Sequence, residues 1–216
     1  MADNTGELFG EDYYINGIKT GLSNYENYRW LPELTLPMAK SFIEIFGVKK
    51  GDTVLDFGTA MAFFVKALRE HGMFAYGVDV SEWAIKNCDP DVVGYVFNKI
   101  EDCPQPFDYI FSKDVLEHIP TNELTKMLEK LFSICIEAAI FIVPLAKSEG
   151  GEYIYPNDEL DKTHIHRKTL QGWVELIEPF ANDFTIFVSQ KIPSLKKASE
   201  QFEGSTGIIY CKKIKK

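Results

Sequence analysis

The sequence is short of positive charge and has no long apolar run. Lys and Arg number 23 against 32 Asp and Glu, giving a formal net charge of −9 over 216 residues. An acidic surface repels phosphate backbones, so bulk duplex DNA or RNA is not an expected partner. No apolar stretch reaches membrane-spanning length, and the start, MADNTGELFGEDYY, has neither the basic nor the apolar part of a signal peptide. We therefore expect a cytoplasmic protein with no membrane partner.

Several chemical signatures are also missing. There is no G-x-S-x-G, P-loop or H-E-x-x-H motif, so hydrolase, NTPase and zincin functions have no support. No two cysteines form a C-x-x-C pair, which predicts reduced packing residues and neither a disulfide framework nor a cysteine zinc site. The four cysteines are Cys88, Cys103, Cys135 and Cys211.

What the chain has is apolar surface to bury. Apolar residues make up 45%, with 16 Phe, 10 Tyr and 3 Trp, and 216 residues suit one domain with a real core. We expect a single domain, 1–216, with two additions. Residues 1–30 are a Tyr-rich N-terminal cap, and the polar stretch 146–168 is a lid-like insertion. The aromatic rings of the cap either stack on a ligand or form a hydrophobic plug.

Short apolar segments alternate with amphipathic ones over most of the chain. Such alternation predicts a parallel sheet covered by helices on both faces. The last two strand-like segments lack a convincing helix between them, so we expect them to pair antiparallel. The prediction is a doubly wound, mostly parallel seven-stranded sheet with an antiparallel C-terminal edge strand. Its strands are TVLDFG, FAYGVDV, GYVFN, FDYIFS, EAAIFIVP, FTIFVSQ and TGIIYCKKI.

A small-residue turn follows the first predicted strand. Asp56 and Gly58 begin it, and Asp79 ends the next strand about twenty residues later. A carboxylate there can accept both hydroxyls of an adenosine ribose, and small residues let the backbone approach a nucleoside. A dinucleotide would need G-x-G-x-x-G, but alanines stand at positions 60 and 62. The pattern favours an adenosine carrying a sulfonium and an amino acid.

These segments resemble the class I S-adenosylmethionine-dependent methyltransferases. VLDFGTAMAFFVKAL is similar to their first motif, D-x-G-x-G-x-G, and YGVDVSEWAIKN to their second. NKIEDCPQPFDYIFSKDVLEHIP is similar to the third and fourth, including L-E-H-I. The likeness covers about residues 40–145 and implies S-adenosylmethionine as cofactor. It departs from the family pattern at Ala62 and at the bulkier Thr59–Met61.

The resemblance implies cofactor contacts at the matching positions. Asp79 would hold the ribose and Val80 would flank the adenine. Gly58 and Ala60 would line the methionine part, with Asp56 near its amino group. The remaining implied contacts are Ile100 and Glu101 beside the adenine, and Ser112 and its neighbours up to Asp114 beneath the methylthio group.

Histidines are the candidates for acid–base chemistry. If the acceptor is a hydroxyl, a general base helps, and histidine is the usual choice near neutral pH. His164 is our first candidate, with His166 and Asp114 as further catalytic candidates; in an extended segment the two histidines would point the same way. Asp114, Glu117 and His118 have helical spacing, similar to the magnesium motif E-x-x-E-H of some quinone-type O-methyltransferases. We interpret them as a solvated helix start and expect no metal.

The predicted function is transfer of a methyl group from S-adenosylmethionine to a small-molecule acceptor. The YGVDVSEWAIKN segment is similar to methyltransferases of glycan or secondary-metabolite pathways, which suggests a hydroxyl of a sugar or secondary metabolite. Two alternatives stay open. One is a methyltransferase acting on a protein or a nucleic-acid end, and the other is a non-catalytic cofactor-binding or interaction module on the same fold.

Overall fold

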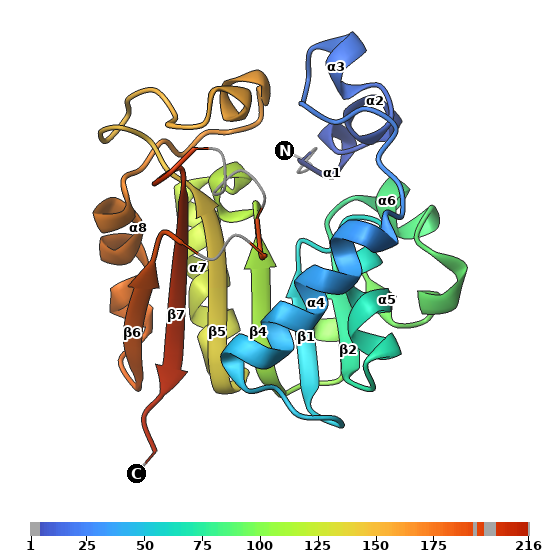
Figure 1. The fold of residues 1–216 in the computed structure, drawn as a ribbon, viewed down its shortest axis with the longest axis vertical. Helices are drawn as coiled ribbons and strands as arrows, with labels where there is room; N and C mark the ends of the chain where they lie inside the picture. Colours follow the sequence, from blue (N-terminus) through green and yellow to red (C-terminus); the bar gives the residue numbers. More distant parts are fainter. Residues whose placement is uncertain (1–4, 192–193, 197–201, 216) are drawn as a thin grey trace. The chain divides into compact units, whose positions relative to one another are not determined.

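The structure is a computed structural model that describes residues 5–191, 194–196 and 202–215 (Figure 1). Its strands form one seven-stranded sheet of order β3-β2-β1-β4-β5-β7-β6. The pairs β1–β2, β2–β3 and β4–β5 are parallel, whereas β7 runs antiparallel to both β5 and β6. The predicted fold class is confirmed. Among the described residues, no helix is long and apolar enough to cross a membrane.

One detail of the strand order differs from the prediction. The C-terminal strand β7, Thr206–Lys213, lies between β5 and β6, so the edge strand is β6, Phe184–Ser189. Most residues of β7 are buried, including Ile208, Ile209 and Cys211. In β6, Phe187 and Val188 are each 51% exposed. An inner strand has neighbours on both sides and an edge strand on one side only, so the burial of β7 and the exposure of β6 agree with this strand order. The apolar runs of the two strands are similar, so their sequences alone do not distinguish the edge strand.

The chain divides into two compact units. Unit 1 comprises Met1–Gln105 and Leu160–Lys162, and unit 2 comprises Pro106–Glu159 and Thr163–Lys216. The elements of unit 1 are α1 (Thr5–Leu8), α2 (Glu11–Tyr14), α3 (Gly17–Thr20), α4 (Pro32–Phe46), β1 (Thr53–Phe57), α5 (Phe63–Glu70), β2 (Phe74–Val78), α6 (Glu82–Lys86) and β3 (Val96–Phe97). Two single-turn 3-10 helices complete it, Pro90–Val92 and Ile100–Asp102.

Unit 2 holds the second half of the sheet. Its elements are β4 (Phe107–Lys113), the 3-10 turn Leu116–His118, α7 (Thr121–Ser133), β5 (Cys135–Pro144), the 3-10 helix Pro156–Leu160 at its border with unit 1, α8 (Leu170–Ile177), the 3-10 turn Glu178–Phe180, β6 and β7. Thr169 caps α8, because its hydroxyl accepts the Gly172 N–H. Trp173 of α8 is fully buried and donates its indole N–H to the Pro144 carbonyl at the end of β5, at 3.1 Å.

Two helix ends differ from what the sequence pattern predicts. The Lys50-Gly51 pair predicts a helix end there, but α4 ends at Gly47, which adopts a left-handed φ of 70°. Glycine takes that conformation without steric cost, so the earlier glycine ends the helix. Thr121 precedes an amphipathic segment, which predicts a helix cap, but it is the first helical residue of α7, and Pro120 occupies the cap position. Pro37 lies inside α4 and does not mark its start.

Candidate functional site

The turn after β1 keeps the backbone conformation of a glycine-rich loop. Gly58, Ala60 and Ala62 have φ angles of 81°, 50° and 60°, all in the left-handed region. Two alanines therefore hold angles that L side chains rarely adopt. The Ala62 N–H donates to the Thr59 carbonyl at 2.9 Å and closes the turn before α5 begins. The loop has the spacing of three glycines but contains only one.

Thr59 ties this turn to the end of β1. Its hydroxyl donates to the Asp56 carboxylate at 2.6 Å, and both residues are buried. A Cβ at Gly77 of β2 would lie 2.6 Å from the Thr59 side chain, so glycine is needed there for the bulky Thr59 to fit. Asp56 therefore lies at the base of the turn.

Asp79 joins the turn to the end of β2. One of its carboxylate oxygens accepts the Ala60 N–H at 2.7 Å, and the other accepts the Ser81 N–H at 2.9 Å. Burial raises the pKa of Asp79, although these two hydrogen bonds work in the opposite direction. An ionised carboxylate has about four acceptor sites, so each oxygen retains capacity for a further donor.

The other predicted cofactor positions of unit 1 differ in exposure. Val80 directly follows Asp79 and is 53% exposed, an unusual environment for an apolar side chain beside a buried carboxylate. Ile100 is buried and Glu101 is exposed, at the first two positions of a 3-10 turn. Unit 1 thus has a buried carboxylate with an exposed apolar neighbour, as an adenosine requires.

The N-terminal helices cover this part of unit 1. Tyr13 and Tyr14 are buried in one hydrophobic cluster with Ala84, against which Ala60 and Met61 also pack. The Tyr14 and Trp83 rings are stacked at 5.8 Å. Ser81 donates its hydroxyl to the Phe9 carbonyl and also caps α6 by accepting the Ala84 N–H. Burial, with Asp79 nearby, raises the pKa of Tyr14. For the two buried tyrosines, this packing matches the hydrophobic-plug alternative.

In unit 2, β4 carries a buried hydroxyl near its end. Ser112 is 1% exposed, and its Oγ has no hydrogen-bond partner within the part of the chain that the structure describes. A buried hydroxyl without a partner costs free energy, so it marks a position where a ligand atom can contribute. This is the residue expected beneath the cofactor's methylthio group.

Asp114 follows β4 with a left-handed φ of 55°. Its two oxygens contact the Lys113 and Lys196 ammonium groups at 2.7 and 2.6 Å. Burial raises the pKa of Asp114, but the two ammonium groups outweigh that effect and hold the pKa well below its usual range. A carboxylate with so low a pKa is a poor general base.

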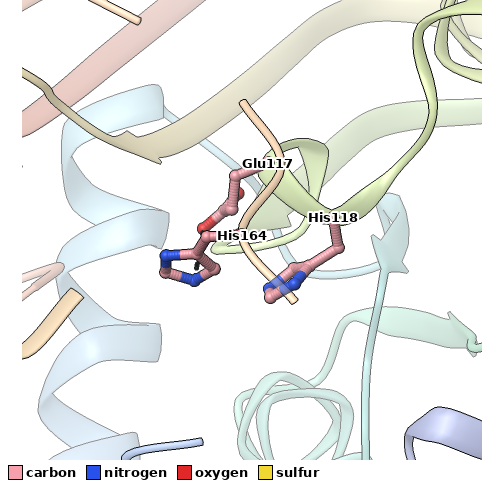
Figure 2. A group of neighbouring side chains, drawn as sticks. All are labelled: Glu117, His118 and His164. Atoms are coloured by element: carbon pink, nitrogen blue, oxygen red, sulfur yellow. Dashed lines mark ion pairs between the residues drawn. The ribbon is translucent and has the colours of Figure 1, made fainter. Parts of the chain in front are cut away.

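Glu117, His118 and His164 form a cluster in unit 2 (Figure 2). One potential ligand atom from each lies within 4.8 Å of the others. Glu117 is 0% exposed, and neither of its carboxylate oxygens has a hydrogen-bond partner among the described residues. His164 Nε2 lies 3.9 Å from Glu117 Oε1. Burial and then the Asp114 charge raise the pKa of Glu117 well above its usual value.

The backbone explains why His164 reaches this cluster. The N–H groups of Ile165 and His166 both donate to the Glu117 carbonyl, at 2.9 and 3.2 Å. These bonds fix the insertion against the turn that carries Glu117 and His118. The His118 and His164 rings are 4.8 Å apart, edge to face.

His166 has different partners. Its Nε2 lies 2.7 Å from the Ile119 carbonyl, which only accepts, so Nε2 carries the proton. Its ring lies against Trp173 at 5.8 Å, and burial lowers its pKa. The structure therefore brings the His164 ring together with Glu117 and His118, whereas the His166 ring contacts Ile119 and Trp173.

The sequence interpretation of Asp114, Glu117 and His118 as a solvated helix start is wrong. Leu116–His118 is a single 3-10 turn, Asp114 lies outside it, and Glu117 is fully buried. The sequence does place a glutamate directly before a histidine, Glu117-His118, but it does not show that the glutamate is buried. Helical spacing alone could not reveal it, because His164 is far away in the sequence.

Comparison with known proteins identifies the family. The family described as "Methyltransferase domain" matches residues 31–184, which is more than half of the chain. An Archaeoglobus fulgidus SAM dependent methyltransferase aligns with a TM-score of 0.64 and 19% identity, covering 85% of this chain and 95% of its own. Magnesium protoporphyrin IX methyltransferase from Synechocystis PCC 6803 with bound SAM gives 0.62 and 16%, covering 99% of each chain. No curated protein sequence matches the chain.

The chain belongs to the methyltransferase domain family and is a class I S-adenosylmethionine-dependent methyltransferase. Unit 1 fits the cofactor, because the turn keeps three left-handed residues and Asp79 keeps acceptor capacity beside exposed Val80. The family match favours an enzyme over the non-catalytic alternative.

Proposed function

We propose that this methyltransferase acts on a hydroxyl oxygen of a small-molecule acceptor such as a sugar or a secondary metabolite. S-Adenosylmethionine supplies an electrophilic methyl group: the C–S bond breaks, a C–O bond forms, and the electron pair stays on sulfur. His164 accepts the hydroxyl proton. The remaining task of the protein is to position the two reactants and exclude water.

In this proposal most of the residues that hold the cofactor belong to unit 1. Asp79 accepts the ribose hydroxyls and Val80 flanks the adenine. Gly58 and Ala60 line the methionine part, with Asp56 near its amino group. The proposed set is completed by Ile100 and Glu101 beside the adenine and Ser112 beneath the methylthio group.

One observation carries the hydroxyl assignment: two imidazoles lie beside a fully buried carboxylate. A hydroxyl loses a proton when it is methylated, and a histidine beside a carboxylate is suited to take it. Mitomycin 7-O-methyltransferase, a solved structure similar in fold at 12% identity and a TM-score of 0.58, is named as an O-methyltransferase, which adds fold-level support.

Asp114 and His166 have supporting roles in this proposal. The two lysine contacts favour Asp114 as a charge partner that positions Lys196. The hydrogen bond to Ile119 favours His166 as a positioning residue for the insertion.

We propose that residues 1–30 and 146–168 together cover the acceptor within one functional domain. Two contacts support this: Tyr13 donates its hydroxyl to Asp161 at 2.6 Å, and the Lys162 N–H donates to the Leu22 carbonyl at 2.9 Å.

A protein or nucleic-acid end is the second candidate acceptor. A Haloferax volcanii complex between the Trm112 methyltransferase activator and a methyltransferase is similar in fold, with 16% identity and a TM-score of 0.63, and it supports testing for a protein partner rather than for a particular acceptor. The net charge of −9 favours the small molecule. A cytoplasmic location remains part of the proposal.

An acceptor panel with a base variant tests the proposal. S-Adenosylhomocysteine formation is measured with sugars, phenols, carboxylic acids, amines and peptides. We expect turnover with hydroxyl acceptors and a fall in kcat of about 10²-fold or more in His164→Gln. The variant's deficit should shrink at high pH, where the acceptor ionises by itself. His71→Gln, an exposed histidine of unit 1, is the control. Turnover only with the other acceptors, or an unchanged His164→Gln, would contradict the proposal.

A further inference from the structure

The Glu117, His118 and His164 cluster has a feature that base catalysis does not explain. A fully buried carboxylate pays a large desolvation cost unless a cation or hydrogen-bond donors compensate it. Both Glu117 oxygens lack a hydrogen-bond partner among the described residues, and His164 Nε2 at 3.9 Å is beyond hydrogen-bond distance. Both Glu117 oxygens therefore have acceptor capacity that a bound cation can use.

We propose that Glu117, His118 and His164 bind a divalent transition-metal ion of the zinc class. Two imidazole nitrogens and one carboxylate oxygen form a ligand set that zinc takes in catalytic sites, with a fourth position open. Ligands at zinc distances lie about 3.3 Å from one another. The atoms here lie within 4.8 Å, so small side-chain rotations suffice to close the site.

The surroundings of His118 suit a metal ligand. Its Nδ1 lies 2.7 Å from the Thr163 hydroxyl. When Nδ1 carries the proton and donates to Thr163, Nε2 presents its lone pair to the ion. Metal-bound histidines are commonly oriented by such a second hydrogen bond.

The donor set also discriminates between ions. Magnesium requires oxygen ligands, and the nearby carboxylate that would supply them, Asp114, is held by Lys113 and Lys196. The imidazole nitrogens of His118 and His164 favour zinc, cobalt or nickel over magnesium.

The role of this ion rests on the proposed function, but its binding does not. With an ion bound, His164 would be a ligand, so the base role proposed for it above belongs to the metal-free protein. An acceptor hydroxyl at the open position would then lose its proton to solvent more readily, because coordination would lower its pKa.

Metal binding is measured directly on untagged, metal-stripped protein. Equilibrium dialysis against Zn²⁺ gives the stoichiometry, and Co²⁺ absorption reports a site with nitrogen ligands. We expect about one equivalent of zinc, no competition from excess Mg²⁺, and a zinc-induced rise in melting temperature. Glu117→Gln and His164→Gln should each weaken binding at least about tenfold. His71→Gln should bind as the wild type does.

The variants separate a metal site from a purely structural cluster. Glu117→Gln should melt no lower than the metal-free wild type, because a neutral amide costs less to bury than a carboxylate. Zinc should no longer raise its melting temperature. Absence of zinc binding, or equal binding by Glu117→Gln, overturns the inference. Zinc binding without turnover of any hydroxyl acceptor upholds the site and overturns the proposed acceptor.

Discussion

Ala60 and Ala62 hold backbone angles that glycine adopts at no steric cost. A non-glycine residue in the left-handed region loses about 1–2 kcal/mol, and glycine costs about 0.5–1 kcal/mol in chain entropy. Ala62 is fully buried, so its methyl contributes packing, whereas Ala60 is partly exposed. The strain is therefore easiest to relieve at Ala60.

Ala60→Gly should raise the melting temperature by about 1–3 °C, corresponding to about 0.5 kcal/mol. Gly58→Ala, which adds a methyl at a φ of 81° in the same turn, is the opposite variant and should lower it. Differential scanning calorimetry of both variants checks the pair. A lower melting temperature for Ala60→Gly would mean that its methyl packs more favourably than the strain costs.

Asp114 gives a charge-based prediction at the same scale. Asp114→Asn leaves two ammonium groups facing a neutral amide and should lower the free energy of unfolding by about 3 kcal/mol at neutral pH. Because the folded pKa is depressed, the carboxylate's contribution is present above about pH 4 and is lost as pH falls through the folded pKa. Urea unfolding of both proteins between pH 7 and pH 3 measures this difference.

The control for Asp114 is Asp183→Asn. Asp183 is 61% exposed and lies 3.8 Å from Lys213, so its loss should cost less than about 1 kcal/mol. Equal effects of the two substitutions, or a difference independent of pH, would contradict the argument.

Among the elements, the N-terminal helices depend on a few buried polar contacts. Tyr13 is 4% exposed, and its hydroxyl donates to the buried Asp161 carboxylate. Tyr13→Phe removes the donor and leaves that oxygen without it, so we expect a loss of about 2 kcal/mol. Trypsin cleavage after the exposed Lys19 should become faster. Tyr95→Phe, outside this cluster, is the control, and unchanged cleavage in Tyr13→Phe would contradict the role of this contact.

Sequence alone predicted the elements whose signals are local. β1, α5 and β2 follow from continuous apolar runs and one amphipathic segment, and Asp79 follows from its place after β2. The end of α4 and the position of β7 depended on competition between neighbouring signals, so they were missed. The histidine cluster could not be predicted, because hydrogen bonds to the Glu117 carbonyl bring His164 to a residue 47 positions earlier.

Over the whole molecule, the residues assigned to the cofactor and to acid–base chemistry fall in different units. All the proposed cofactor contacts except Ser112 belong to unit 1, and Asp114, Glu117 and the histidines 118, 164 and 166 belong to unit 2. Cofactor binding and acceptor chemistry can therefore be tested by separate variants.

The most direct test of the account is calorimetric titration with S-adenosylhomocysteine and S-adenosylmethionine. We predict micromolar binding by the wild type and a loss of at least about tenfold in Asp79→Asn and Asp79→Ala, since each weakens the ribose contact. Asp91→Ala, a substitution of an exposed unit 1 carboxylate, should bind as the wild type does. Thermal melting confirms that each variant is folded. Absence of heat with either ligand, or full affinity in folded Asp79→Ala, would contradict the assignment of the cofactor to this turn.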